Sequence, residues 1–247
     1  MTDATAAGTS GPTVALVHGA FADSSGWNGV LERLLPAGLP VRAISNPLRG
    51  ITADAAYVAS AFAQIPGPVL AVGHSYGGAV ITNAAAVADN VVGLVYVAAF
   101  APEEGEILGE VESGSKDSVL NTALVELRYP TGQGTETAAE FAIAPEKFHD
   151  VFAADLPVEQ TTVMAATQRP VAALAFSERN GTPAWKALPS WAVVATGDKA
   201  AGSDVVGSMA QRAGATIVEA GGSHVIMMSQ PQIVTDVLLQ AIDVVSR

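Results

Sequence analysis

Short runs of apolar residues alternate along the chain with longer segments in which apolar residues recur at helical spacing. Each run is apolar at nearly every position, which is typical of a strand buried on both faces in a parallel sheet. The pattern predicts strands at residues 13–18, 40–45, 68–74, 91–98, 191–195 and 216–219. The intervening segments predict helices at residues 27–35, 53–65, 75–88, 205–212 and 231–245. We therefore expect an α/β fold with a doubly wound, mostly parallel sheet of about six strands.

This alternation is interrupted between residues 103 and 187. The segment opens with Pro-Glu-Glu-Gly at 102–105, contains several amphipathic stretches and has no convincing strand pattern. Apolar side chains share a face over 119–127 and again over 148–152, and a further run begins at Gln160 and is interrupted at Pro170. We predict an inserted helical cap at 103–187, which covers a core formed by residues 1–102 and 188–247.

Composition and charge narrow the range of partners. Apolar residues make up 49% of the 247 residues and charged ones 15%, so the chain can build one substantial core. The formal net charge of -12 repels phosphate backbones and anionic lipid headgroups, which argues against nucleic acid and membrane partners. A small, neutral, hydrophobic ligand fits these properties better. The sequence leaves both a monomer and a homodimer open.

Targeting segments, metals and cofactors are not indicated. Residues 1–12 lack the basic and apolar regions of a signal peptide, and no apolar run approaches the roughly 18 residues that a membrane helix needs. We expect a loose N-terminal tail on a cytoplasmic protein. The absence of cysteine excludes disulfides, thiolate metal sites and cysteine nucleophiles. No spacing resembles a metal-ligand cluster or a nucleotide-binding loop, so we expect no metal and no cofactor.

The motif GHSYGG at residues 73–78 falls where a predicted strand ends and a predicted helix begins. In that context Gly-x-Ser-x-Gly forms a sharp turn whose cramped backbone is tolerated because Gly73 and Gly77 have no side chains. The turn lifts the Ser75 hydroxyl above the carboxyl edge of the sheet and aims the first amides of the helix at developing negative charge. Ser75 is the candidate nucleophile, and an ordinary glycine-rich turn is the alternative.

A serine hydroxyl needs a base to remove its proton, and the chain offers four histidines. His224 follows the last predicted strand in a Gly-Gly-Ser-His loop, so it should lie at the same sheet edge as Ser75. His74 is expected to face away, because neighbouring strand residues point to opposite faces. His18 is expected to brace loops at a strand end, and His149 to lie on a turn of the cap. His224 is therefore the candidate base, with a surface histidine as the alternative.

The imidazole must in turn be oriented by a carboxylate. Asp198 comes directly after a predicted strand and should also lie at the carboxyl edge. Asp204 is the main rival, although the Gly-Ser pair before it indicates the N-cap of the next helix. Asp23, beside the first strand, is a weaker rival. We favour Asp198 as the acid.

With these motifs the chain resembles the α/β-hydrolase-fold serine hydrolases, and the resemblance extends from Thr13 to Val245. The order Ser75, Asp198, His224 is the order of nucleophile, acid and base in that family. Ala-Thr-Gly-Asp at 195–198 resembles the usual Gly-x-x-Asp around the acid, with alanine in place of glycine.

The resemblance also implies an oxyanion site. His-Gly-Ala-Phe at 18–21 resembles the oxyanion-loop motif of the family, which implies that the amides of Ala20 and Tyr76 hold the oxyanion. Phe21, in the same motif, is then expected to contact the substrate.

The start at Thr13 leaves no room for the first two strands of larger members, and in this the chain is similar to the compact plant-type methyl-ester esterase and hydroxynitrile lyase branch. Lyases of that branch have a lysine after the catalytic histidine and a threonine after the histidine of the oxyanion loop. This chain has Val225 and Gly19 at those positions. The absence of the lysine and the threonine of the lyases favours ester hydrolysis over cyanohydrin cleavage.

We therefore predict a carboxylic-ester hydrolase that cleaves small or medium hydrophobic esters or lactones through an acyl-enzyme intermediate. The alternatives are a lyase or a perhydrolase-type haloperoxidase on the same fold and, at a greater distance, a non-catalytic ligand receptor or a cofactor-free oxygenase. The cap should roof the pocket. Met164 is a candidate substrate contact, because a flexible side chain adapts to ligands of different shape; packing of the cap onto the core is the alternative.

Overall fold

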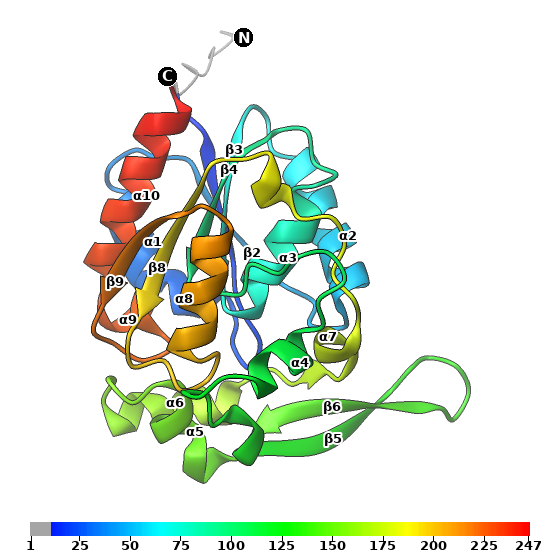
Figure 1. Ribbon diagram of the computed structural model, residues 1–247. Helices are drawn as coiled ribbons and strands as arrows, with labels where there is room; N and C mark the ends of the chain where they lie inside the picture. Colours follow the sequence, from blue (N-terminus) through cyan, green and yellow to red (C-terminus); the bar gives the residue numbers. More distant parts are fainter. Residues whose placement is uncertain (1–10) are drawn as a thin grey trace, which may run out of the picture.

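The computed structural model describes residues 11–247, so the loose tail expected over residues 1–12 falls almost entirely outside the described part of the chain. Six strands form one parallel sheet in the order β2-β1-β3-β4-β8-β9 (Figure 1). They are β1 (Thr13–Val17), β2 (Val41–Ile44), β3 (Val69–His74), β4 (Val91–Val97), β8 (Ser190–Ala195) and β9 (Thr216–Ala220). Each lies on one of the six predicted apolar runs, so the predicted α/β fold class is confirmed.

Helices cover both faces of this sheet, which explains why its central strands are apolar at nearly every position. In Figure 1, α1 and α10 pack together on one side of the sheet, and α2 and α3 on the other. The helices of the core are α1 (Asn28–Leu34), α2 (Ile51–Ala63), α3 (Tyr76–Ala84), α8 (Ser203–Arg212), α9 (Ile226–Ser229) and α10 (Pro231–Val245). None of the helices within residues 11–247 has the length and apolar character to cross a membrane.

The segment between β4 and β8 differs from the predicted cap. It contains the helices α4 (Leu108–Ser113), α5 (Pro145–Phe152), α6 (Val158–Thr167) and α7 (Leu174–Ser177). It also contains an antiparallel sheet of three strands, β5 (Leu124–Pro130), β6 (Thr137–Ile143) and β7 (Val171–Ala172). The insertion predicted at 103–187 thus contains helices as expected, but the expectation that it has no strand is wrong.

The missed strands have a physical explanation. Residues 119–127 form a short 3-10 turn, Leu120–Thr122, followed by β5, rather than one helix. Strand β5 pairs with β6 along its whole length, yet most of its side chains are exposed. Main-chain pairing therefore defines this hairpin, and no buried face imposes an alternating apolar pattern on the sequence.

Polar contacts attach the insertion to the core. Arg49 places a guanidinium nitrogen 2.7 Å from a carboxylate oxygen of Glu140 on β6, and its guanidinium carbon lies 4.4 Å from the ring centroid of Tyr129 on β5. The amide of Ala172 on β7 donates to the carbonyl of Leu48 at 2.9 Å. Figure 1 shows the insertion lying across the end of the sheet at which the arrows of the strands point. The insertion thus covers the edge of the sheet at which the carboxyl ends of its strands lie.

Ser75 occupies the sharp turn between β3 and α3. Its φ of 54° and ψ of -126° lie in a backbone region that residues with side chains adopt only under constraint. A Cβ built on Gly73 would lie 2.6 Å from backbone atoms of Gly77 and Gly78, and one on Gly77 would lie 2.6 Å from the carbonyl oxygen of Val17. The two glycines therefore allow β3, α3 and β1 to approach within backbone contact.

We expect Gly73→Ala to lower the free energy of unfolding by roughly 1–3 kcal/mol, because the added methyl group would overlap main-chain atoms. Urea-induced unfolding measures this change. Gly221→Ala is the matched control, since a Cβ there meets no atom within 4 Å; its effect should stay below about 1 kcal/mol. Equal stability of the two variants would contradict the close approach of strand and helix.

Candidate active site

Ser75 and His224 line the same small cavity at the carboxyl edge of the sheet, under the insertion. The cavity has an empty volume of about 250 Å³, and we call it the Ser75 cavity. Both residues are almost fully buried. The rest of its lining is apolar and includes Ala20, Phe21, Phe100, Leu120, Phe152 and Phe176. A ligand here would lose most of its contact with water.

The structure brings His224 and Asp198 together. Nδ1 of His224 lies 2.8 Å from Oδ2 of Asp198, and both side chains are buried. The other carboxylate oxygen accepts the amides of Ala200 at 2.9 Å and Ala201 at 3.0 Å, which hold the carboxylate in one orientation. Because a carboxylate accepts the Nδ1 proton, the neutral ring carries no proton on Nε2 and can accept one there.

The two rival carboxylates have other partners. Asp204 accepts the Ser115 hydroxyl at 2.5 Å and the Lys116 amide at 2.9 Å, both from the insertion. Asp23 accepts the Ser25 amide at 2.7 Å and caps the short 3-10 helix Ser24–Trp27. Asp198 is therefore the one of the three that lies against His224.

His74 differs from the prediction that it faces away. Its Nε2 donates to the carbonyl oxygen of His224 at 2.9 Å, and the two ring centroids are 4.7 Å apart. Burial, together with the neighbouring charge of His224, holds the pKa of His74 well below its usual value, so its ring is neutral. The residue before the nucleophile thus fixes the backbone of the candidate base. The alternation of side chains along β3 cannot predict this contact, because His224 lies on a loop that is distant in the sequence.

Asp155 is a site residue that the sequence reasoning missed. It lies in the turn between α5 and α6 and accepts the Ser223 amide at 2.8 Å, and its other carboxylate oxygen accepts the Ser223 hydroxyl. Ser223 directly precedes His224. The insertion therefore holds the loop that carries the candidate base. No local signal marks this pair, since 68 positions separate its members.

His18 braces the loop after β1. Its Nε2 accepts the Asn46 amide at 2.9 Å and faces a guanidinium nitrogen of Arg169 at 3.2 Å, while Nδ1 donates to the Gly19 carbonyl at 2.9 Å. Burial, reinforced by the charge of Arg169, lowers the pKa of His18 to about 4, so the ring is neutral near neutral pH. This arrangement fixes the loop that contains Ala20.

The two expected oxyanion donors follow adjacent strands in the sequence. Ala20 lies in the loop after β1, and Tyr76 is the first residue of α3, directly after Ser75. Because β1 and β3 are paired, both amides belong to the same stretch of the carboxyl edge as Ser75. A Cβ on Gly19 would lie 2.6 Å from Cβ of Ser75, which shows how closely this loop approaches the serine.

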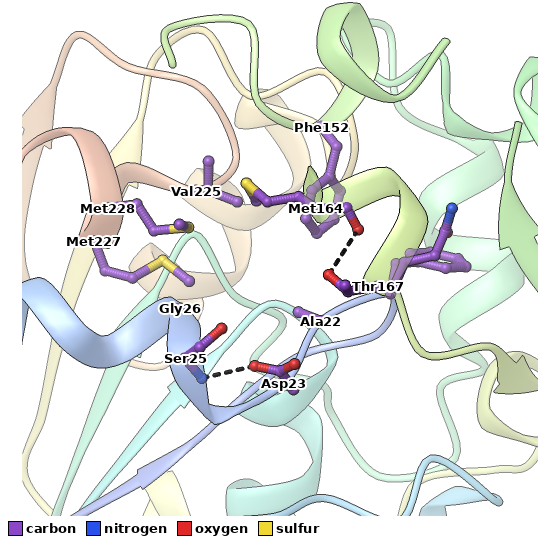
Figure 2. A pocket seen from close by; sticks show the side chains of 12 residues that line it. Ala22, Asp23, Ser25, Gly26, Phe152, Met164, Thr167, Val225, Met227 and Met228 are labelled. Carbon is purple, nitrogen blue, oxygen red and sulfur yellow. Dashed lines mark hydrogen bonds between the residues drawn. The ribbon is translucent and has the colours of Figure 1, made fainter. Parts of the chain in front are cut away.

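The two predicted substrate contacts share one pocket. Phe21 lines both the Ser75 cavity and a second, neighbouring pocket with an empty volume of about 370 Å³, whereas Met164 lines only the second (Figure 2). Met227 and Met228 from α9 line it as well, so we call it the methionine pocket. Met164 is also packed against the core.

Comparison with solved structures shows a common fold. Polyneuridine aldehyde esterase superposes with a TM-score of 0.77 at 19% identity, over 93% of this chain and 98% of the other. A methylesterase from Arabidopsis gives 0.75 at 20% identity, over 94% and 99%. Tomato methylketone synthase I, in complex with 2-tridecanone, gives 0.75 at 19% identity, over 94% and 98%.

Two sequence comparisons complete this picture. No curated protein matches the chain. The profile of the alpha/beta hydrolase family matches residues 14–237, which include the turn at Ser75, the loop of Asp198 and the loop of His224. The chain belongs to the alpha/beta hydrolase family.

Proposed function

We propose that this protein is a carboxylic-ester hydrolase that cleaves small or medium hydrophobic esters or lactones through an acyl-enzyme intermediate. One observation carries the proposal. His224 is bonded through Nδ1 to a buried carboxylate, and it lines the same cavity as Ser75, which is held in a constrained turn. A buried acid–base pair that lines one cavity with a constrained serine supports nucleophilic catalysis by that serine.

In the first half of the reaction, the Ser75 hydroxyl attacks the acyl carbon while its proton passes to Nε2 of His224. Asp198 stabilises the imidazolium that forms. The amides of Ala20 and Tyr76 donate to the oxyanion, and the positive end of α3 adds to their effect. The tetrahedral intermediate then collapses, the bond to the alcohol oxygen breaks, and His224 returns the proton to the leaving alcohol.

In the second half, water attacks the acyl carbon while His224 takes its proton, the bond to Oγ of Ser75 then breaks, and His224 returns the proton to Ser75 as the carboxylic acid is released. The apolar lining of the Ser75 cavity supports a hydrophobic substrate, and the net charge of -12 disfavours an anionic one. A cytoplasmic location remains a prediction from the sequence.

Two positions argue against cyanohydrin cleavage. A threonine at Gly19 would bring its Cβ to 2.6 Å from that of Ser75, so the loop has no room for the side chain of the lyases. Val225, which stands where they have a lysine, is buried and uncharged. Ester hydrolysis needs neither group.

Ser75→Ala is expected to lower kcat for ester hydrolysis on the order of 10³-fold or more, because it removes the nucleophile and leaves the turn unchanged. Initial rates with p-nitrophenyl esters measure the loss, and an unchanged urea midpoint shows that the variant is folded. Near wild-type rates in the variant would refute the proposal.

A fluorophosphonate provides an independent measurement on the unmodified protein. It should attach covalently to Ser75, as mass spectrometry of the digested protein would show. Attachment at another serine, or none in a folded sample, would contradict the assignment of the nucleophile.

Asp198→Asn and Asp204→Asn form a matched pair, since both exchange one carboxylate oxygen for an amide. Asp198→Asn should cost on the order of 10³-fold or more in kcat, because it stabilises the wrong tautomer of His224. Asp204→Asn should leave ester turnover within about twofold, because the Asp204 carboxylate binds Ser115 and Lys116 of the insertion rather than His224. The same ester assay checks both, and the opposite order would assign the acid to Asp204.

A further inference from the structure

The Ser75 cavity and the methionine pocket share two walls, the side chains of Phe21 and Phe152. The two rings meet edge to face, with centroids 6.3 Å apart and an interplanar angle of 88°. The methionine pocket continues along Val225, the residue after His224, while the Ser75 cavity contains His224 itself. The two spaces are therefore neighbours across one pair of aromatic rings.

The backbone at Phe21 is constrained. Its φ of 59° lies in the left-handed region, which bulky residues seldom adopt and which persists only where the surroundings hold it. The ring is also stacked on Phe176, with centroids 6.5 Å apart and planes inclined by 19°. Contacts with Phe152 and Phe176 thus hold the Phe21 ring where the two spaces meet, and the ring lines both of them.

The methionine pocket is built from three separate parts of the chain. Figure 2 shows Met164 coming from α6 of the insertion, Met227 and Met228 from α9, and Asp23 from the loop after β1. Unbranched thioether side chains fill irregular space and adjust to ligands of different shape. The pocket can therefore accept flexible apolar groups rather than one rigid shape.

The polar side chains around this pocket already have partners. Gln168 accepts the Ile143 amide at 2.8 Å and donates to the carbonyls of Ile143 at 2.8 Å and Ala165 at 3.0 Å. The Thr167 hydroxyl donates to the Val163 carbonyl at 3.0 Å. The surface that the pocket offers to a ligand is therefore chiefly apolar.

Asp23 is the charged group of the pocket. Partial burial alone would raise the pKa of Asp23, but the hydrogen bonds from Ser25 outweigh it and hold the pKa below its usual value. The carboxylate is therefore ionised near neutral pH, and it disfavours a ligand that carries its own carboxylate.

We propose that the methionine pocket binds an uncharged alkyl chain of the ester substrate, which extends past Phe21 and Phe152 while the ester carbonyl lies at Ser75. The inference rests on the proposed esterase function and names its substrate class: esters in which one side is a medium-length aliphatic chain. That chain belongs either to the acyl group or to the alcohol, and two ester series separate these cases.

The test uses Met164→Gln, which places an amide in the pocket, and Val163→Gln as the control. Val163 is the neighbouring residue on α6, is 62% exposed and is not part of the pocket lining. One series compares p-nitrophenyl acetate with p-nitrophenyl octanoate, and the other compares ethyl acetate with octyl acetate. The value of kcat/KM is measured for each ester with each protein.

Met164→Gln should lower kcat/KM for the long ester of one series by about 10-fold to 200-fold relative to its short ester. Val163→Gln should leave that ratio unchanged. The series that responds identifies the side of the ester that enters the pocket. An equal loss for short and long esters would reduce Met164 to a packing role, and unchanged ratios in both series would also overturn the inference.

A binding measurement keeps this inference separable from the proposed function. If the wild-type protein hydrolyses no ester, the esterase proposal fails, and calorimetric titration of 1-octanol into Ser75→Ala then tests the pocket alone. When Met164→Gln is combined with Ser75→Ala, octanol should bind about 10-fold more weakly than to Ser75→Ala alone. When Val163→Gln is combined with Ser75→Ala, the affinity for octanol should not change. Equal affinity of the two double variants would overturn the pocket assignment.

Discussion

The site depends on the close approach of three backbone segments at the carboxyl edge of the sheet. Strand β1, strand β3 and helix α3 come so near one another that a Cβ at Gly73, Gly77 or Gly19 would lie 2.6 Å from another atom. This crowding fixes the unusual backbone of Ser75 and brings the loop of Ala20 beside it. A fixed position for hydroxyl and amides costs no reorganisation when negative charge develops.

His224, in contrast, lies on a loop and is held from three directions. Asp198, after β8, fixes the ring through Nδ1, and His74, at the end of β3, donates to the backbone carbonyl. Asp155 of the insertion binds the preceding Ser223. Each contact comes from a different element, so the position of this candidate base depends on the whole edge of the core and on the insertion above it.

The difference between what the sequence predicted and what it did not follows from the range of the interactions. The six strands of the core were predictable, because burial on both faces imposes continuous apolar runs. The turn at Ser75 was predictable because its glycines are local. The hairpin β5–β6 was not, since β5 is mostly exposed and β6 mostly half-buried, so neither strand carries a continuous apolar run. Nor were the contacts of His74 and Asp155 with the His224 loop, which join residues far apart in the chain.

If the proposed function holds, the insertion connects substrate selection with the chemistry through side chains that line both cavities. The ring of Phe152, on α5, lies 5.0 Å from the His224 ring and lines both cavities. A change at Phe152 therefore alters the surroundings of the candidate base and the shape of both spaces together. Met164 contributes to the methionine pocket without lining the Ser75 cavity. Under the two proposals, substitutions at Met164 would change selectivity without touching the Ser75 cavity, whereas those at Phe152 would change both spaces.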